Sequence, residues 1–164
     1  MNLQWYRRPR LVVLNSNAAV LDAARAIEQN RIGAVVVQDE GRVVGIVTDR
    51  DLAVRALGRA RDATSTRIAD VMTPFPATLA PDDSLADAVW LMQERNIRRI
   101  PLVEDGRVVG MVTLDDLLLD EAAPLEALAA VVAAQISGPV SGDSFMYSTG
   151  GAVICDCGTV RVGR

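Results

Sequence analysis

The segment GRVVGIVTDRDL at positions 41–52 returns as GRVVGMVTLDDL at positions 106–117, which is 65 residues later in the chain. Around it, residues 19–52 align with residues 84–117 without a gap, and 12 of the 34 aligned pairs are identical. A repeat of this kind means that one supersecondary unit occurs twice, and it limits the fold to two related units. Two copies without an insertion predict lobes related by a pseudo-two-fold axis.

Both copies show the same order of sequence patterns. A short apolar stretch, at 11–14 or 77–79, predicts a strand, and apolar residues at helical spacing follow it. Two further apolar stretches joined by a Gly-containing acidic turn predict a hairpin, at 34–37 and 43–47 or at 100–103 and 108–112. A second helix begins at Thr48 or Thr113. The predicted fold class is α/β (α+β), built from duplicated β-α-β-β-α units.

The start of the first helix differs between the copies. In the second copy, Pro81 and the Asp-Asp-Ser cluster at 82–84 are typical helix-start residues. In the first copy, Ser-Asn-Ala-Ala stands at 16–19, and Asn17 is the residue available as an N-cap.

These patterns divide the chain into four parts. We expect the first unit (copy 1) at residues 11–60 and the second unit (copy 2) at residues 68–120, joined by a polar connection at 58–67. Pro124 opens a predicted C-terminal helix at 124–137 with an apolar face. Residues 138–164 form a Gly/Ser-rich tail, either disordered or an appendage, with one short strand expected at Ala152–Cys155.

Composition excludes several classes of function. The chain has no His, and its 17 basic residues are all Arg, so His-dependent triads and Lys-containing phosphate loops are absent. The net charge of −4 disfavours nucleic-acid binding, because that binding depends on neutralising phosphates. Cys155 and Cys157 supply only half of a zinc site, and an incidental pair is favoured.

Targeting signals are also missing from the pattern. The basic residues Arg7, Arg8 and Arg10 precede only four apolar residues, whereas a secretory signal needs roughly 7–15. The apolar stretch at 124–136 is shorter than the roughly 20 residues of a membrane-spanning helix. We therefore expect a cytoplasmic protein with no membrane partner.

Two β-α-β-β-α units that each end in Gly-apolar-apolar-Thr-x-x-Asp-Leu resemble a tandem pair of cystathionine-β-synthase (CBS) domains, also called a Bateman module. The match lies in residues 45–52 and 110–117, supported by Ile-Ala-Asp-Val-Met-Thr at 68–73 and Arg-Arg-Ile-Pro-Leu-Val at 98–103. The resemblance covers about residues 11–120, and two such motifs in register make it specific.

The resemblance implies a regulatory sensor and not an enzyme. Such modules bind adenosine-containing ligands (AMP, ADP, ATP or S-adenosylmethionine) in clefts between the copies, here with or without Mg²⁺ and with no required cofactor. They pair as homodimers and signal to a partner protein, whose identity the sequence does not give. The alternative is a protein-interaction scaffold whose nucleotide clefts are vestigial. Catalysis by the remaining carboxylates, hydroxyls and Arg residues is disfavoured.

The ligand-binding residues follow from the repeated motif. A carboxylate accepts hydrogen bonds from both ribose hydroxyls, which suits Asp51 and Asp116. The hydroxyls of Thr48 and Thr113, with the first N–H groups of the helices, suit phosphate. Thr-x-x-Asp is also close to a helix capping box, so each pair could be a cap and nothing more. The two roles are compatible.

The copies differ in charge around this motif. Arg98 and Arg99 precede a strand of copy 2, where the resemblance implies contact with phosphate; a solvated basic edge is the alternative. Copy 1 has Gly33 and Ala34 at those positions. Copy 1 instead has Arg50 inside its motif, whereas copy 2 has Asp115. We therefore expect one better nucleotide cleft, with Thr48, Arg50 and Asp51 beside Arg98 or Arg99.

The resemblance also implies an apolar slot for adenine. Plain core packing is the alternative for each of its walls. The residues implied are Val13, Leu14, Gly33, Ala34, Thr78, Ile100 and Pro101.

Overall fold

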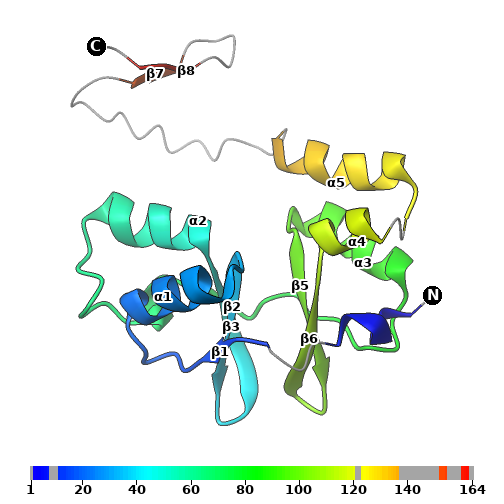
Figure 1. The fold of residues 1–164 in the computed structure, drawn as a ribbon, viewed down its shortest axis with the longest axis horizontal. Coiled ribbons are helices and arrows are strands. Elements are labelled where there is room, and N and C mark those ends of the chain that lie inside the picture. Colours follow the sequence, from blue (N-terminus) through cyan, green and yellow to red (C-terminus); the bar gives the residue numbers. More distant parts are fainter. Residues whose placement is uncertain (1, 8–10, 121–122, 137–151, 155–159, 163–164) are drawn as a thin grey trace.

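The computed structural model describes residues 2–7, 11–120, 123–136, 152–154 and 160–162. Figure 1 shows two lobes side by side, with copy 1 in blue to cyan and copy 2 in green to yellow. The hairpins of the two copies meet in the middle of the molecule, and the helices lie outside them. The predicted duplication of one β-α-β-β-α unit is confirmed.

Copy 1 folds in the predicted order. Its second helix begins with regular α geometry and changes to wider π geometry after one turn. The elements are β1 (Val13–Leu14), α1 (Val20–Asn30), β2 (Ala34–Asp39), β3 (Arg42–Thr48), α2 (Asp49–Asp51), the π-helix η2 (Leu52–Ala56) and the 3₁₀ turn η3 (Leu57–Arg59). The connection contributes a 3₁₀ turn, η4 (Ile68–Asp70), and a short strand, β4 (Thr73–Pro74), which pairs with β3.

Copy 2 repeats the arrangement with one difference. Its elements are α3 (Leu85–Arg95), β5 (Arg99–Glu104), β6 (Arg107–Thr113) and α4 (Leu114–Leu119). The strand expected at 77–79 is reduced to a single parallel bridge between Leu79 and Leu102. The C-terminal helix α5 (Leu125–Ile136) follows Pro124 as expected. Farther on, β7 (Ala152–Ile154) covers most of the short strand expected in the tail and pairs with β8 (Val160–Val162).

The two central hairpins share their turn chemistry. Glu40 and Gly41 turn the β2–β3 hairpin with φ values of 50° and 78°, and Asp105 and Gly106 turn the β5–β6 hairpin with 52° and 80°. Positive φ at both central residues is the geometry that matches the twist of two-residue hairpins. The same turn fixes the same register in both copies.

The first helices of the copies start differently, and one expectation is wrong. Ser84 caps α3 by accepting from the Asp87 N–H at 3.2 Å, while Asp87 accepts from the Ser84 N–H at 3.0 Å. In copy 1 the N-cap is Ala19 and not Asn17. The Ala19 N–H donates to Asp22 at 3.1 Å, so Asp22 supplies the stabilising carboxylate and no side chain caps the helix from the N-cap position.

The core has a layer in each lobe and a seam between them. Side chains of a strand alternate between its two faces. In β2, Val35 and Val37 pack with α1, whereas Ala34 and Val36 join Met111 of copy 2 in the seam. This explains why β2 is apolar at consecutive positions: both of its faces are covered.

The segment that precedes each copy packs on the other copy. The 3₁₀ turn η1 (Leu3–Tyr6) lies beside β6 of copy 2, where the N-terminus is drawn in Figure 1. The Tyr6 carbonyl there lies directly over Gly110, with no room for a Cβ atom. At the matching position of copy 1, Gly45 lies against the side chain of Met72. Each glycine lets a crossing segment approach its strand, and these crossings tie the two lobes together.

Candidate functional site

Each Thr-x-x-Asp motif forms the capping box at the start of a second helix. In copy 1 the Thr48 N–H and hydroxyl donate to Asp51 Oδ2 at 2.9 and 2.8 Å, and Thr48 Oγ1 accepts from the Asp51 N–H at 3.1 Å. In copy 2 the same three bonds join Thr113 and Asp116 at 3.0, 2.6 and 3.1 Å. The capping alternative therefore describes both motifs, and it fixes the direction in which each carboxylate points.

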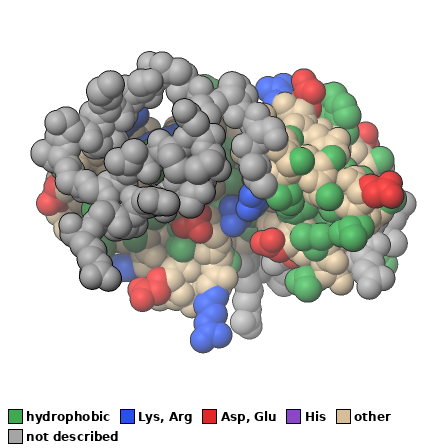
Figure 2. Space-filling model, turned by 90° about the horizontal axis from the view of Figure 1, so that it is seen from above, with side chains coloured by type: hydrophobic (Ala, Val, Ile, Leu, Met, Phe, Trp, Pro, Cys, Tyr) green, Lys and Arg blue, Asp and Glu red, His purple; other side chains and the backbone are tan. Residues whose placement is uncertain are grey.

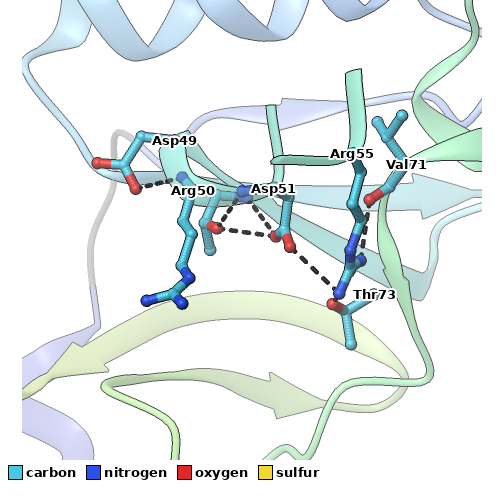
Figure 3. Close-up of polar contacts among 7 residues, drawn as sticks. Asp49, Arg50, Asp51, Arg55, Val71 and Thr73 are labelled. Carbon is cyan, nitrogen blue, oxygen red and sulfur yellow. Dashed lines mark hydrogen bonds and ion pairs between the residues drawn. The ribbon is translucent and has the colours of Figure 1, made fainter. Parts of the chain in front are cut away.

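In copy 1 a basic side chain completes the motif. Arg55 lies 3.3 Å from Asp51 Oδ1, one helical turn after it, and also donates to the Val71 carbonyl at 2.9 Å and to the Thr73 hydroxyl at 3.1 Å. Figure 3 shows Arg55 reaching from the helix to the Val71–Thr73 segment, while Arg50 points away from this network. Asp51 is thus held between its own cap and Arg55, with its side chain 13% exposed.

A cavity of about 750 Å³ opens beside this motif, between the two copies. It brings together Thr48, Arg50 and Asp51 of copy 1 with Arg98 and Arg99 of copy 2. Its apolar walls come from the connection and from both copies: Ile46, Phe75, Pro76, Ala77 and Ile97. The remaining lining residues are Asp49, Thr73, Arg95, Asn96 and Gln135.

The cavity is rich in positive charge. Four arginines line it, against two carboxylates, so the charged side chains sum to +2. Figure 2 shows blue basic side chains at the centre of the face seen from above, next to red acidic ones. Guanidinium groups bind phosphate through two parallel hydrogen bonds, and confinement in a cavity strengthens that attraction. The arrangement suits a ligand with both an anionic and an apolar part.

Two of these arginines contact residues of other elements. The guanidinium of Arg99 crosses the seam and lies against Gly33, where a Cβ atom would collide with it. The side chain of Arg98 donates from Nε to Gln135 Oε1 of α5. The absence of a side chain at Gly33 therefore leaves room for the Arg99 guanidinium. The helix α5 reaches the cavity through Gln135.

The residues implied for an adenine slot do not gather in this cavity. Val13 and Ala34 pack in the seam, Leu14 packs in the core of copy 1, and Ile100 lies fully buried in the core of copy 2. Pro101 is also buried, in β5. Exposed Thr78 lines a separate hollow of about 510 Å³ between the β2–β3 and β5–β6 turns. The apolar walls of the cavity are Phe75–Ala77 together with Ile46 and Ile97.

The matching region of copy 2 has different chemistry. Asp120 occupies the place of Arg55, and Asp115 the place of Arg50. The phenol of Tyr6 donates a hydrogen bond to Asp120, and burial, this hydrogen bond and the nearby carboxylates raise the pKa of Tyr6 to about 12. Gly33 and Ala34, the copy 1 residues that align with Arg98 and Arg99, carry no charge. The described residues near the copy 2 motif thus include the carboxylates Asp115, Asp116 and Asp120.

Sequence reasoning missed several residues of the site. Arg55 stands four residues after Asp51, and this helical spacing was an available signal for an ion pair. Arg95 follows from its place at the end of α3, next to Arg98. No local pattern announces Phe75 or Gln135, because each reaches the cavity from a separate element.

The described residues contain neither a metal-binding cluster nor a membrane-spanning helix. Within 2–7, 11–120 and the other described ranges, no group of three His, Cys, Asp or Glu side chains has an arrangement that would hold a metal ion. Cys155 and Cys157 lie outside the described residues. Among the helices that the structure describes, none combines the length and the apolar character needed to cross a bilayer.

The family model and similar relatives point to the same family. The sequence model of the CBS domain matches twice, at residues 6–58 and 68–121. The CBS domain-containing protein YhcV of Bacillus subtilis is 34% identical over 112 residues, which cover 68% of this chain and 79% of YhcV. YlbB of the same organism is 38% identical over 104 residues, or 62% of this chain and 70% of YlbB.

Solved structures agree with the sequence comparison. The CBS domain protein TA0289 of Thermoplasma acidophilum superposes with a TM-score of 0.76 at 25% identity, covering 84% of this chain and 77% of TA0289. The CBS domain pair of protein MJ0100, solved in complex with 5′-methylthioadenosine and S-adenosyl-L-methionine, gives a TM-score of 0.67 at 28% identity over 75% of this chain and 98% of that one. The duplicated sequence, the two lobes and these matches lead to one conclusion: the chain belongs to the CBS domain family and carries two CBS domains in tandem.

Proposed function

We propose that this CBS pair is a regulatory sensor that binds an adenosine-containing ligand in the cavity between its copies. The observation that carries the proposal is the meeting of Thr48 and Asp51 of copy 1 with Arg98 and Arg99 of copy 2 in one cavity. The MJ0100 pair, which holds two adenosyl ligands, supports the ligand class. A charged tail on the ligand would account for four arginines around one cavity.

The ribose, phosphate and adenine of such a ligand would each contact a different part of the cavity lining. Asp51 faces the cavity with an orientation fixed by Thr48 and Arg55, and its carboxylate would accept a ribose hydroxyl. Arg98 and Arg99, with Arg50 opposite, would bind the phosphate groups. The apolar Phe75–Ala77 stretch would cover one face of the adenine.

We propose unequal clefts as the basis of ligand choice. In the second cleft, Thr113 and Asp116 would meet a ligand beside Asp115 and Asp120, which repel phosphate. That cleft would bind an adenosyl ligand without phosphate, or none. Nucleotides carrying phosphate would bind in the first cleft.

Thermal-shift titration tests the ligand class. AMP, ADP, ATP and S-adenosylmethionine are titrated separately, with ribose 5-phosphate and GMP as controls. A ligand at about 100 times its Kd adds about 2.7 kcal/mol to the free energy of unfolding. The proposal requires a shift with at least one adenosyl ligand and a smaller shift with both controls. Equal shifts with GMP would remove adenine as the recognised group.

A matched pair of variants tests the arginines. The double variant Arg98→Ala/Arg99→Ala should lose the preference for ATP over adenosine. Arg107→Ala removes an exposed arginine at the start of β6, outside the cavity lining, and should keep that preference. An unchanged preference in the double variant would overturn the assignment of the phosphate site.

A protein-interaction scaffold is the second candidate function. An apolar hollow of about 510 Å³ between α3 and α5 favours it, with Trp90 (62% exposed) on its rim. A scaffold with vestigial clefts would show no thermal shift with any adenosyl compound. The titration above therefore separates the two candidates.

We propose a homodimer as the assembly. Large apolar side chains remain exposed on the outer helices of both copies: Val54, Leu57, Trp90, Leu118, Leu119 and Leu125. Burying them against a second copy would remove apolar area from water, which is the main driving force of association. Light scattering during size-exclusion chromatography should give twice the mass of one chain; a monomer at micromolar concentration would contradict the assembly.

A further inference from the structure

The helix α5 lies on copy 2 and reaches the nucleotide cavity at one end. In Figure 1 its yellow N-terminal end lies over α3 and α4, and its orange C-terminal end points toward copy 1. Gln135, in its last turn, is the one described α5 residue in the lining of the cavity. The helix therefore joins the cavity to the C-terminal side of the molecule.

The first part of α5 is firmly attached. Leu128 and Val131 are 2% and 0% exposed in the core of copy 2. Gln93 of α3 donates to the Ala127 carbonyl of α5 at 3.0 Å. These contacts do not involve the cavity charges, so they hold this part of the helix whether the cavity is empty or filled.

Beyond Val132, which still packs against the core of copy 2, the last turn of α5 contacts the cavity through the side chain of Gln135. Gln135 Oε1 accepts from Arg98 Nε, whereas Gln135 Nε2 is buried and has no hydrogen-bond partner within the described residues. An unpaired buried donor costs free energy. The Gln135 amide is therefore only half satisfied in this arrangement.

A phosphate group would be a stronger hydrogen-bond partner for Arg98 than the Gln135 amide is. Of the four arginines that line the cavity, it is the one whose side chain has a hydrogen bond to another described side chain. A phosphate carries full negative charge and accepts two parallel hydrogen bonds from a guanidinium, whereas the Gln135 oxygen is a neutral acceptor of one. The neutral Gln135 amide would lose Arg98 to a phosphate group.

We propose that the Arg98–Gln135 contact is a ligand-sensitive latch, in which ligand phosphate takes Arg98 from Gln135 and releases the last turn of α5. The inference rests on the proposed nucleotide function and adds its route of regulation. Filling of the cavity would thereby change the C-terminal end of α5, while Leu128 and Val131 keep the rest of the helix in place.

Linkage makes the latch measurable in two directions. If bound nucleotide disfavours the Arg98–Gln135 contact by a given factor, then removing the contact by mutation raises nucleotide affinity by that same factor. Gln135→Ala should therefore bind ATP more tightly than the wild type, by about fivefold, the lower end of typical couplings. A residue that merely contacts the ligand would give the opposite sign, because its loss weakens binding.

The experiment combines calorimetric ATP titration with amide hydrogen exchange on the full chain. In the wild type, saturating ATP should speed exchange at 132–136 and leave 125–131 unchanged. In Gln135→Ala, exchange at 132–136 should be fast without ATP and should not respond to it. Gln93→Ala is the matched control: it removes the other glutamine contact of α5, away from the cavity, and should keep the wild-type Kd and the wild-type response at 132–136.

Each failure is distinguishable. If ATP binds the wild type and exchange at 132–136 does not change, the latch is overturned and the nucleotide site stands. If Gln135→Ala weakens ATP binding, the latch is overturned and Gln135 is a direct ligand contact. If none of AMP, ADP, ATP and S-adenosylmethionine binds the wild type, the proposed function and the latch both fall.

Discussion

The carboxylate of Asp51 faces the guanidinium of Arg55 across 3.3 Å, and copy 2 has Asp120 in the place of Arg55. Two motifs with the same capping geometry thus meet opposite charges one helical turn later. In copy 1 the arginine ties the motif to the connection through Val71 and Thr73. In copy 2 the carboxylate meets Tyr6 of the N-terminal segment. The duplication preserves the capping geometry, while the residue one helical turn after the motif changes from Arg55 to Asp120.

Removing Arg55 should destabilise the fold. Arg55→Ala leaves the Val71 carbonyl and Asp51 without their shared donor. Hydrogen bonds to charged groups contribute about 1.5–3 kcal/mol, and the 36% exposure of Arg55 lowers this to about 1–2 kcal/mol. Urea denaturation measures the loss. Exposed Arg59, one helical turn later, is the matched control, and an equal cost for Arg59→Ala would refute this role of Arg55.

The two capping threonines should be equal in stability and unequal in binding. Thr48→Ala and Thr113→Ala each remove a side-chain cap, at a cost of about 1 kcal/mol in the free energy of unfolding. Only Thr48 lines the cavity with the arginines, so Thr48→Ala alone should weaken AMP binding. Paired denaturation and binding measurements decide this, and weaker AMP binding by Thr113→Ala would count against unequal clefts.

The matched glycines Gly45 and Gly110 should respond differently to alanine. A Cβ at Gly110 meets the backbone of Tyr6 and Arg7, which cannot move alone, whereas a Cβ at Gly45 meets the flexible side chain of Met72. Overpacking of this kind costs roughly 1–3 kcal/mol, so Gly110→Ala should reach that range and Gly45→Ala should cost less. Chemical denaturation compares the two; the reverse order would show that the Tyr6–Arg7 crossing is easily displaced.

High pH should destabilise the protein through Tyr6. Its pKa is raised from 10.0 to about 12, chiefly by burial and then by Asp120. Between pH 10 and 12 the unfolded chain releases this proton and the folded chain keeps it, so the free energy of unfolding falls as pH rises. Below pH 10 the contribution is fully present. Tyr6→Phe should show a shallower fall over this range, and identical slopes would exclude Tyr6 as the titrating group.

The sequence predicted what local patterns determine. The repeat is visible in the sequence itself. Turns and helix caps depend on neighbours within a few residues, as at Glu40–Gly41, Asp105–Gly106, Thr48 and Thr113. Asn17 was the wrong cap because the chain enters α1 two residues later than that pattern suggested, and Asp22 supplies the stabilising carboxylate.

The features that sequence reasoning missed depend on long-range contacts. Phe75 and Gln135 reach the cavity from the connection and from α5, so no spacing in either segment reveals their role. The side chain of Arg99 crosses the seam to Gly33, a contact that depends on how the two lobes pack. Alternation in β2 shows why Ala34 is a seam residue: both faces of that strand are covered.

Calorimetric titration of AMP into the wild type, Asp51→Asn and Asp116→Asn, each confirmed as folded by its urea transition, tests the unequal clefts most directly. We predict one AMP per chain in the wild type, loss of that binding in Asp51→Asn, and wild-type binding in Asp116→Asn. Two equal sites per chain, or loss of AMP binding in Asp116→Asn with retention in Asp51→Asn, would contradict it.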